Sequence, residues 1–264
     1  MADYLTYPMK NLRITQHYTG RTSHRPHWCN LKTGKPLPGI KDYPTDNGGK
    51  DGGKDPVYAT VDLIVYRIWG VGTAGINTLF VNTKDKVKLA NGKTDYACWY
   101  MTHPNDADLR KYKPGMVIKK GSIICYEGTD GCSANHIHLG VGLGKLTGNG
   151  WAANANNKYV ITCTGGPLKP EDAFFVDPQF TKVLGTAGIP FKKLPAASST
   201  PAATYKTTAA LKIRADAGTT YAVVGQLKKG AKVSVTETKT VGGVTWGKIP
   251  QGWICLSYAK KVVK

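Results

Sequence analysis

The chain has 264 residues, of which 41% are hydrophobic, and its formal net charge is +19. This length suffices for two domains or one large one, each with a hydrophobic core. No run of about 18 apolar residues occurs, which excludes a membrane-spanning helix. The first residues also lack the basic region and apolar stretch of a secretion signal, so no standard signal peptide is expected.

The positive charge is concentrated near the end of the chain. From residue 202 onward there are eleven basic and two acidic residues, so 63 residues carry +9 of the total charge. Such a field attracts polyanions, among them nucleic acids, anionic membranes and anionic cell-wall polymers. Because the sequence contains no recognisable nucleic-acid-binding module, we expect no nucleic-acid partner.

The predicted elements are short strands that follow two long loops, over 24–42 and 47–55. Strands are expected over 57–68, 77–82, 95–101 and 122–126, and in a run that begins at His136. Glycine or Asn-Gly turns separate them, which is typical of antiparallel meanders. Short helices are expected within 104–112 and around 169–175. The first domain, over 1–191, is therefore predicted to be mainly β with long loops.

A second domain is predicted after a linker. Residues 192–204 are small and polar and contain proline, a composition that cannot form a packed core. Over 205–264, short strands alternate with glycine turns, which indicates a small β-barrel. The chain is thus expected to hold two β-rich domains joined by this linker.

The pair His136 and His138 is the most informative motif. Side chains alternate along a strand, so both imidazoles should lie on one face, about 7 Å apart at the backbone, while Ile137 points to the core. Such a pair can converge on one metal ion. A catalytic zinc site has three protein ligands and an open position. The chain has six histidines, only three glutamates and no HExxH motif. Histidine is therefore expected to do the acid–base work, with aspartate as the carboxylate ligand.

Several segments in order carry a resemblance to a known family. The chain resembles the lysostaphin-like zinc endopeptidases of the M23 family, which cut peptides of bacterial peptidoglycan, and particularly their phage-borne members. The resemblance covers residues of about 10 to 180. It rests on Ser23-His24, Tyr43-Pro44-Thr45-Asp46, Trp99-Tyr100-Met101-Thr102-His103, Gly128-Thr129-Asp130-Gly131-Cys132-Ser133 and His136-Ile137-His138.

By that resemblance, the first domain has the antiparallel-sheet fold of these peptidases, and zinc is held by His24, Asp46 and His138. His103 and His136 are implied to be the catalytic residues, one accepting the proton of the attacking water and both donating to the oxyanion. The first ligand segment departs from the family, in which its His and Asp lie only a few residues apart.

Alternatives to these residue assignments stay open. Asp42 is an alternative to Asp46, and His27 is an alternative to His24. His103 could instead cap the following helix. Tyr18 is a candidate for substrate binding, as a residue that either lines a groove or fills the core.

Residues 205–264 resemble the bacterial SH3 domain, which in many wall hydrolases binds the enzyme to peptidoglycan or its attached polymers. Tyr221 and Trp253 are the candidate ligand-contacting residues, with core packing as the alternative. The resemblance implies peptidoglycan and anionic wall polymers as partners, no membrane insertion, and a monomer.

The function expected from these resemblances is zinc-dependent hydrolysis of peptidoglycan peptides by an antimicrobial phage or prophage endolysin. Such an enzyme would be made in the bacterial cytoplasm without a signal peptide and released to the wall through a separate pore. One alternative is a non-catalytic wall-binding protein with a degenerate metal site. Another is a cysteine hydrolase that uses Cys29 or Cys98 with His136, although the six cysteines are expected to be reduced and mostly buried.

Overall fold

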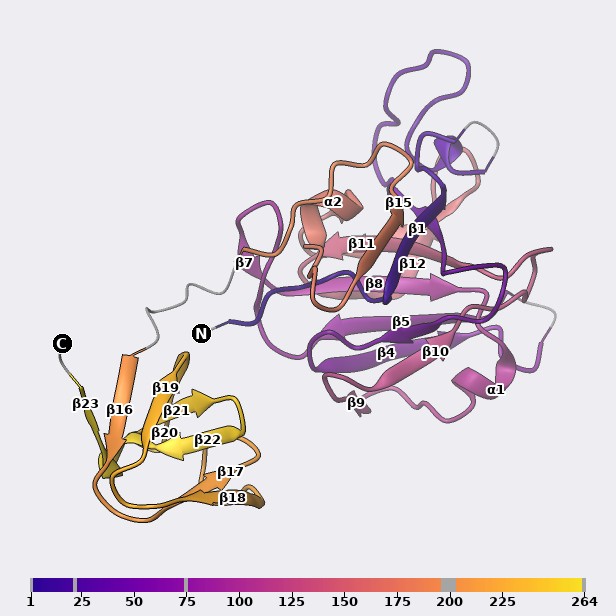
Figure 1. The fold of residues 1–264 in the computed structure, drawn as a ribbon. Coiled ribbons are helices and arrows are strands. Elements are labelled where there is room, and N and C mark those ends of the chain that lie inside the picture. The colour runs from indigo at the N-terminus through magenta and orange to yellow at the C-terminus, as the bar shows by residue number, and fades with distance from the viewer. Residues whose placement is uncertain (1, 21–22, 74–75, 196–202, 263–264) are drawn as a thin grey trace. The chain divides into compact units, whose positions relative to one another are not determined.

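The computed structural model describes residues 2–20, 23–73, 76–195 and 203–262, and it divides into two compact units, Met1–Leu194 and Pro195–Lys264 (Figure 1). Strands predominate in both units, which confirms the predicted mainly β class. Most of the predicted linker, residues 196–202, lies outside the described residues. In the described part of the chain, no helix is both long and apolar enough to cross a membrane.

The first unit contains fifteen strands and three short helical segments within its described residues. The strands are β1 (Asn11–Gln16), β2 (Thr45–Gly48), β3 (Pro56–Tyr58), β4 (Leu63–Trp69), β5 (Thr78–Thr83), β6 (Val87–Lys88), β7 (Thr94–Asp95), β8 (Ala97–Thr102), β9 (Val117–Ile118), β10 (Ile123–Tyr126), β11 (Ile137–Leu143), β12 (Leu146–Ala153), β13 (Tyr159–Cys163), β14 (Pro167–Leu168) and β15 (Lys182–Gly185). The helical segments are the 3-10 turn η1 (Arg25–His27), α1 (Asp106–Leu109) and α2 (Pro170–Ala173).

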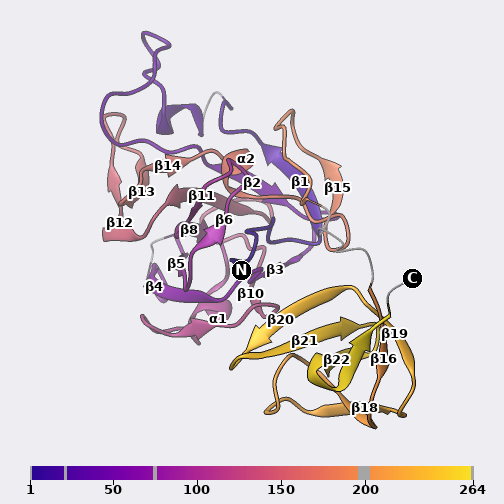
Figure 2. The same ribbon diagram turned by 90° about the vertical axis from the view of Figure 1, so that its left-hand side faces the viewer.

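One large sheet organises this unit. Its strand order is β15-β1-β2-β11-β8-β5-β4-β9, with β14 also paired to β11. All of these pairs are antiparallel except β1 with β15, which is parallel. Figure 1 shows β11, β8, β5 and β4 running side by side across the unit, and Figure 2 shows them in the same order from the side. The β12–β13 hairpin forms a separate two-stranded sheet.

The central strands are buried on both faces. Every residue of β5 and of β8 is buried. Trp99 and Met101 of β8 point into the main core, whereas Cys98 and Tyr100 point into a second cluster with Phe80, because neighbouring side chains alternate between faces. Trp151, from the β12–β13 hairpin, packs against this second cluster. The hairpin therefore covers the face of the sheet on which Tyr100 lies.

The prediction of one continuous strand over 57–68 is wrong. The structure divides it into β3, which pairs with β10, and β4, which pairs with β5 in the large sheet. At the break, the amide of Ala59 donates to Ser122 and the hydroxyl of Thr60 donates to Thr6. The segment therefore contributes one strand to each of two sheets. The sequence does not show this division, because its residues favour a strand throughout. The helices expected near 104–112 and 169–175 are confirmed as α1 and α2.

The second unit consists of antiparallel strands around its own core. Its elements are β16 (Ala203–Thr207), β17 (Leu211–Arg214), β18 (Val223–Leu227), β19 (Lys232–Val235), β20 (Glu237–Val241), β21 (Val244–Ile249), β22 (Gly252–Cys255), the 3-10 turn η2 (Leu256–Tyr258) and β23 (Ala259–Lys261). They form a three-stranded sheet, β19-β16-β23, and a five-stranded sheet, β18-β17-β22-β21-β20. Leu211, Ile213, Val235, Ile249 and Ile254 form the buried cluster. The SH3-like assignment of this unit stays a prediction.

Candidate metal centre

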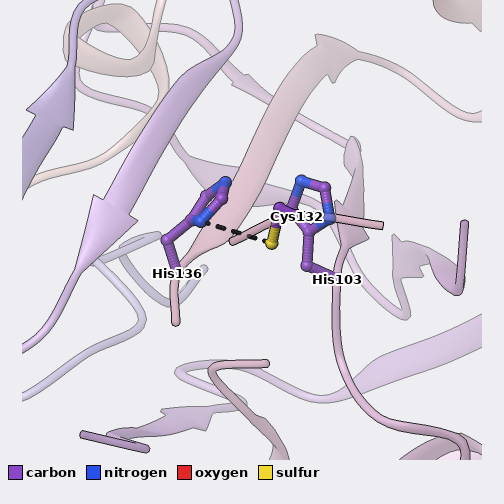
Figure 3. Close-up of side chains that lie close together, drawn as sticks. All are labelled: His103, Cys132 and His136. Atoms are coloured by element: carbon purple, nitrogen blue, oxygen red, sulfur yellow. Dashed lines mark hydrogen bonds between the residues drawn. The ribbon is translucent and has the colours of Figure 1, made fainter. Parts of the chain in front are cut away.

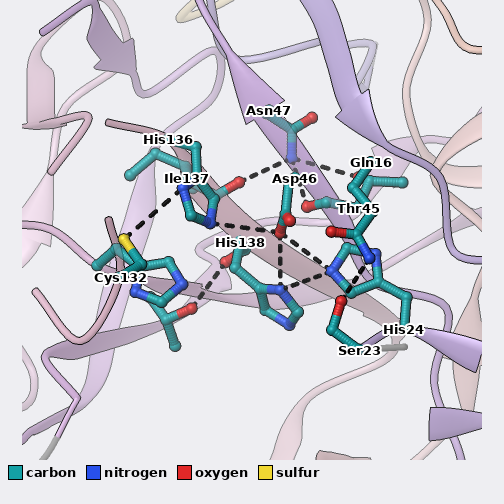
Figure 4. Close-up of polar contacts among 12 residues, drawn as sticks. Gln16, Ser23, His24, Thr45, Asp46, Asn47, Cys132, His136, Ile137 and His138 are labelled. Atoms are coloured by element: carbon teal, nitrogen blue, oxygen red, sulfur yellow. Dashed lines mark hydrogen bonds and ion pairs between the residues drawn. The ribbon is translucent and has the colours of Figure 1, made fainter. Parts of the chain in front are cut away.

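Two groups of potential metal ligands lie next to each other in the first unit. One consists of His103, Cys132 and His136 (Figure 3), and the other of His24, Asp46 and His138 (Figure 4). The second group contains the three residues that the sequence predicts as zinc ligands. Their side chains come from three separate segments, so the fold has to assemble them.

The donor atoms of His24, Asp46 and His138 form a small triangle. His24 Nε2 lies 3.1 Å from Asp46 Oδ1 and 3.1 Å from His138 Nδ1, and the last two atoms are 2.9 Å apart. In a tetrahedral zinc site with ligand distances of about 2.0 Å, donor atoms lie about 3.3 Å apart. The observed triangle is therefore close to the size of a zinc coordination face, and it leaves one side open.

Strand pairing creates this triangle. In the β2–β11 ladder, His138 is directly opposite Asp46, and Ile137 is opposite Asn47. Asn47 strengthens the register because its side-chain amide donates to the carbonyl of Ile137 at 3.0 Å. Residues that pair directly across antiparallel strands carry neighbouring side chains on one face. His24 comes from outside the sheet, just before η1, and is 1% exposed.

Hydrogen bonds to the far ring nitrogens orient both ligand histidines. His24 Nδ1 lies 3.2 Å from the carbonyl of His17, so this nitrogen carries the proton and Nε2 presents a lone pair. His138 Nε2 lies 3.5 Å from the hydroxyl of Tyr100, which itself donates to Asp42 at 2.8 Å. With these tautomers, three lone-pair atoms face one another, an arrangement that a bound cation stabilises. The donor set therefore fits zinc.

Asp42, the alternative carboxylate ligand, lies behind the site instead. It is fully buried, and its oxygens contact His27 Nδ1 at 2.8 Å, the Tyr100 hydroxyl, and the amide of Ile161 at 3.1 Å. These partners occupy the carboxylate, so Asp42 supports the ring of Tyr100 rather than joining the triangle. His27, the alternative to His24, is also part of this supporting network.

Tyr100 reaches its position only because residue 140 is glycine. A Cβ atom on Gly140 would lie 2.4 Å from the Tyr100 ring. Gly140 is opposite Tyr100 in the β8–β11 ladder, so the ring can lie flat across the neighbouring strand. The ring then stacks on His138 with a centroid distance of 5.9 Å. Tyr100 belongs to the Trp99–His103 segment that carries the family resemblance, but its contact with His138 and the need for glycine at position 140 were not predicted from the sequence.

The electrostatics of the triangle favour a cation. Burial alone would raise the pKa of Asp46, but its contacts with the His138 and His24 rings hold that pKa well below its usual value. Burial lowers the pKa of His138 to about 4, against the opposing effect of Asp46. Asp46 is therefore ionised and His138 neutral near pH 7, which are the states that bind metal ions.

His103 and His136, the predicted catalytic residues, lie beside the triangle. Their ring centroids are 4.4 Å apart, and His136 Nε2 is 3.5 Å from Asp46 Oδ1. His103 Nδ1 lies 2.6 Å from the carbonyl of Asp130, and His136 Nδ1 lies 2.8 Å from that of Ala134. Each Nδ1 therefore donates a proton, and each Nε2 retains a lone pair. Both rings are prepared to accept a proton from a group held at the open side of the triangle.

The backbone of His103 has an unusual conformation. Its φ angle is +82°, in the left-handed region that residues other than glycine seldom adopt. Strain of this kind persists where surrounding contacts hold it. Here the amide of His103 donates to Asn77 at 3.0 Å, and its carbonyl accepts from the amide of Asp130 at 3.2 Å. Asp130 in turn accepts from the amide of Asn77.

The predicted alternation of side chains along His136, Ile137 and His138 is confirmed. The two imidazoles face Asp46, and Ile137 between them is 1% exposed in the main core. The strand itself begins one residue later than expected. His136 forms an isolated bridge with Gly128 just before β11.

A hollow extends from the histidines along the sheet face. A cavity of ≈ 230 Å³ is lined by Tyr100, Thr102, His103 and His138 together with Ser23, His27, Ile76, Trp151, Lys158 and Tyr159. An adjoining hollow of ≈ 440 Å³ shares Ile76, Trp151 and Tyr159 with it and adds Arg67, Trp69, Asn149 and Ala152. The candidate metal centre therefore opens into an aromatic groove that carries two basic side chains.

The three residues predicted to contact substrate have different environments. Tyr18 is 9% exposed, belongs to the main core and donates to Glu171 at 2.9 Å. Trp253 is 7% exposed and packs against Trp246 in the second unit. The structure thus gives both rings a packing role, the alternative that the sequence left open. Tyr221 is 44% exposed, and its role in binding stays a prediction.

Neither Cys29 nor Cys98 is placed to act as the nucleophile of a cysteine hydrolase with His136. All six cysteines are free thiols. Cys29 is buried, and neither Cys29 nor Cys98 belongs to a ligand group with His136 among the described residues. A hydrogen bond with Cys163 and burial both raise the pKa of Cys98. The thiol beside His136 is Cys132, whose pKa is also raised, mainly by burial.

Comparisons with known proteins find only distant similarity, and only to solved structures. No protein-family model and no curated protein matches the sequence. Among solved structures it is similar to the antimicrobial peptidase lysostaphin from Staphylococcus simulans, with 15% identity over 97% of this chain and 92% of that one and a TM-score of 0.36. It is also similar to a zinc-containing peptidase from Vibrio cholerae, with 18% identity over 62% and 40% of the two chains and a TM-score of 0.33. A solution structure of lysostaphin gives 16% identity over 81% and 78%, with a TM-score of 0.30.

Proposed function

We propose that this protein is a zinc-dependent endopeptidase that hydrolyses peptide bonds of bacterial peptidoglycan. The observation that carries the proposal is the triangle of donor atoms from His24, Asp46 and His138, with two further imidazoles beside its open side. His24, Asp46 and His138 would hold the zinc. When bound, the zinc would supply a Lewis acid that polarises a carbonyl and acidifies water.

The acid–base steps fall to His103 and His136. Each presents an Nε2 lone pair, because its Nδ1 proton is held by a backbone carbonyl. One of them accepts the proton of the attacking water and then returns it to the leaving amine. The other donates to the oxyanion of the tetrahedral intermediate when it is protonated. Burial lowers the pKa of His103, which keeps that ring neutral and able to accept a proton near pH 7.

The groove suits a short, acidic peptide. Trp151 and Tyr159 offer flat apolar walls, and Lys158 and Arg67 offer positive charge. Peptides of the wall carry free carboxylates, which these cations would bind. The basic second unit, with +9 of the net charge from residue 202 onward, would hold the enzyme on anionic wall polymers.

We further propose that the protein acts as a phage or prophage endolysin, with an SH3-like second unit as its wall-binding module. Incubation of the purified protein with defined cell walls, followed by mass analysis of the released fragments, tests the function directly. New amino termini within the wall peptides are expected, and they identify the bond that is cut. Asp46→Ala should release none, and His136→Ala should release them far more slowly, while both variants keep the native circular dichroism spectrum.

A non-catalytic wall-binding protein is the competing candidate. It predicts binding to walls without new amino termini. Sedimentation of the protein with walls, measured in the same samples, separates wall binding from hydrolysis. Hydrolysis by Asp46→Ala at the rate of the unaltered protein would contradict the proposed role of the triangle.

A further inference from the structure

A thiol stands among the proposed catalytic histidines. Cys132 Sγ lies 3.7 Å from His136 Nδ1, and the rings of His136 and His103 are 4.4 Å apart between centroids. One ligand atom from each of the three residues lies within 4.8 Å of the others (Figure 3). All three residues are distinct from the His24–Asp46–His138 triangle.

The chemistry of this group suits a soft divalent cation. One thiolate and two imidazoles form a donor set that zinc, cadmium and cobalt(II) bind well. Cys132 is neither fully buried nor engaged in a disulfide, so an ion can reach its sulfur. Its present contacts are weak, with Sγ 3.3 Å from the carbonyl of Ala134 and 3.8 Å from that of Gly128. Neither contact would prevent the sulfur from turning toward a metal ion.

We propose that His103, Cys132 and His136 form a second metal site, whose occupation by excess zinc or a similar soft cation inhibits the enzyme. Binding there replaces the thiol proton, which passes to solvent, by a metal–sulfur bond. This site is separate from the one that holds the catalytic metal.

Inhibition follows from the tautomers of the two histidines. If the second metal takes Nε2 of a ring, it occupies the lone pair that accepts the proton of water. If it takes Nδ1, the proton of that ring must move to Nε2, which then has no lone pair to offer. Either arrangement removes the proton acceptor from His103 and His136. The inference rests on the proposed function only for this consequence, not for metal binding itself.

Cobalt(II) titration of the full-length, metal-free protein tests the site. Cobalt bound to a thiolate produces an ultraviolet charge-transfer band that histidine and aspartate ligands do not produce. The unaltered protein should develop this band on the second equivalent of metal. Cys132→Ser should lack the band, and Cys163→Ser, which removes another partly buried thiol of the same unit, should keep it.

The inhibition is measured on wall hydrolysis with the same three proteins. Added zinc should inhibit the unaltered protein and Cys163→Ser alike, whereas Cys132→Ser should need a concentration at least about tenfold higher. A charge-transfer band that survives Cys132→Ser would overturn the second site. A band that depends on Cys132 but arises on the first equivalent supports the second site, and contradicts the proposed catalytic metal centre instead. Equal inhibition of all three proteins would overturn the inhibitory role.

Discussion

The carbonyl oxygen of His103 lies 2.0 Å from the point that a Cβ atom on Gly128 would occupy. The two segments can approach this closely only because residue 128 has no side chain. This close contact positions the backbone of His103, which has a φ of +82°. That backbone in turn places the His103 ring next to the His136 ring. Gly128 is therefore a positioning residue for His103, although it touches no ligand.

Gly128→Ala should displace His103 and lower the rate of wall hydrolysis by about 100-fold, since misplacing a catalytic group by about 1 Å has this effect. Zinc content should stay at the level of the unaltered protein, because the triangle does not include His103. Gly185→Ala is the matched control, since a Cβ atom there meets nothing within 4 Å. A Gly128→Ala protein with full activity would show that the position of His103 is not required.

Tyr100→Phe removes the hydroxyl between His138 Nε2 and Asp42 while keeping the ring. Loss of such a supporting partner typically weakens metal binding by about 10–100-fold, and we expect a loss in this range. Competition with a chromophoric chelator measures the zinc affinity. Tyr66→Phe is the control, because its hydroxyl donates to the carbonyl of Gly148 instead. Equal affinities of the two variants would contradict the supporting role of Tyr100.

His103→Ala and His136→Ala should each lower the rate of wall hydrolysis by about 10²–10⁴-fold, the usual contribution of a general acid or base. The bound catalytic zinc should remain, since neither side chain belongs to the triangle. His17→Ala is the control, because only the backbone carbonyl of His17 contacts His24. Loss of zinc from His136→Ala would make that residue a ligand rather than a catalytic base.

Glu127 gives the first unit a pH-dependent stability. It is fully buried, and burial raises its pKa to about 7, although the amide of Asp55 donates to it at 3.1 Å. The folded protein therefore holds a proton that the unfolded chain releases near pH 4.5. The stability that Glu127 contributes is fully present below that pH and is lost as the pH rises through about 7, by on the order of 3 kcal/mol.

Urea unfolding between pH 5 and pH 8 measures this decline. Glu127→Gln should flatten the pH dependence, because the substituted side chain cannot ionise. Glu237→Gln, an exposed carboxylate paired with Lys248 in the second unit, is the control for the loss of a carboxylate. An unchanged slope in Glu127→Gln would show that another group is responsible.

Local sequence patterns predicted the elements near the site well. Alternation alone placed His136 and His138 on one face with Ile137 in the core, because the two-residue period of an extended chain is independent of its partners. The helices α1 and α2 were found from local signals, and the mainly β class followed from the many short β-forming runs.

The features that the sequence did not predict depend on which strands pair with each other. The pairing of β2 with β11 sets Asp46 opposite His138, whereas the sequence favoured Asp46 over Asp42 only through the family resemblance. Nor does the sequence show that residues 57–68 divide between two sheets. The same reason explains why Tyr18 and Trp253 were open to two interpretations, since an aromatic residue lines a groove or fills a core according to distant neighbours.

The contact between Cys132 and His136 was also missed, although only three residues lie between them in the sequence. The turn between Gly128 and His136 folds the sulfur back toward the ring, and this geometry depends on the bridge between those two residues.

The most direct test of the zinc-centred account is the rate of wall hydrolysis before and after complete removal of zinc from the purified protein. The rate should fall to the background without zinc and return when one equivalent is added back. Undiminished hydrolysis by the zinc-free protein would contradict the account.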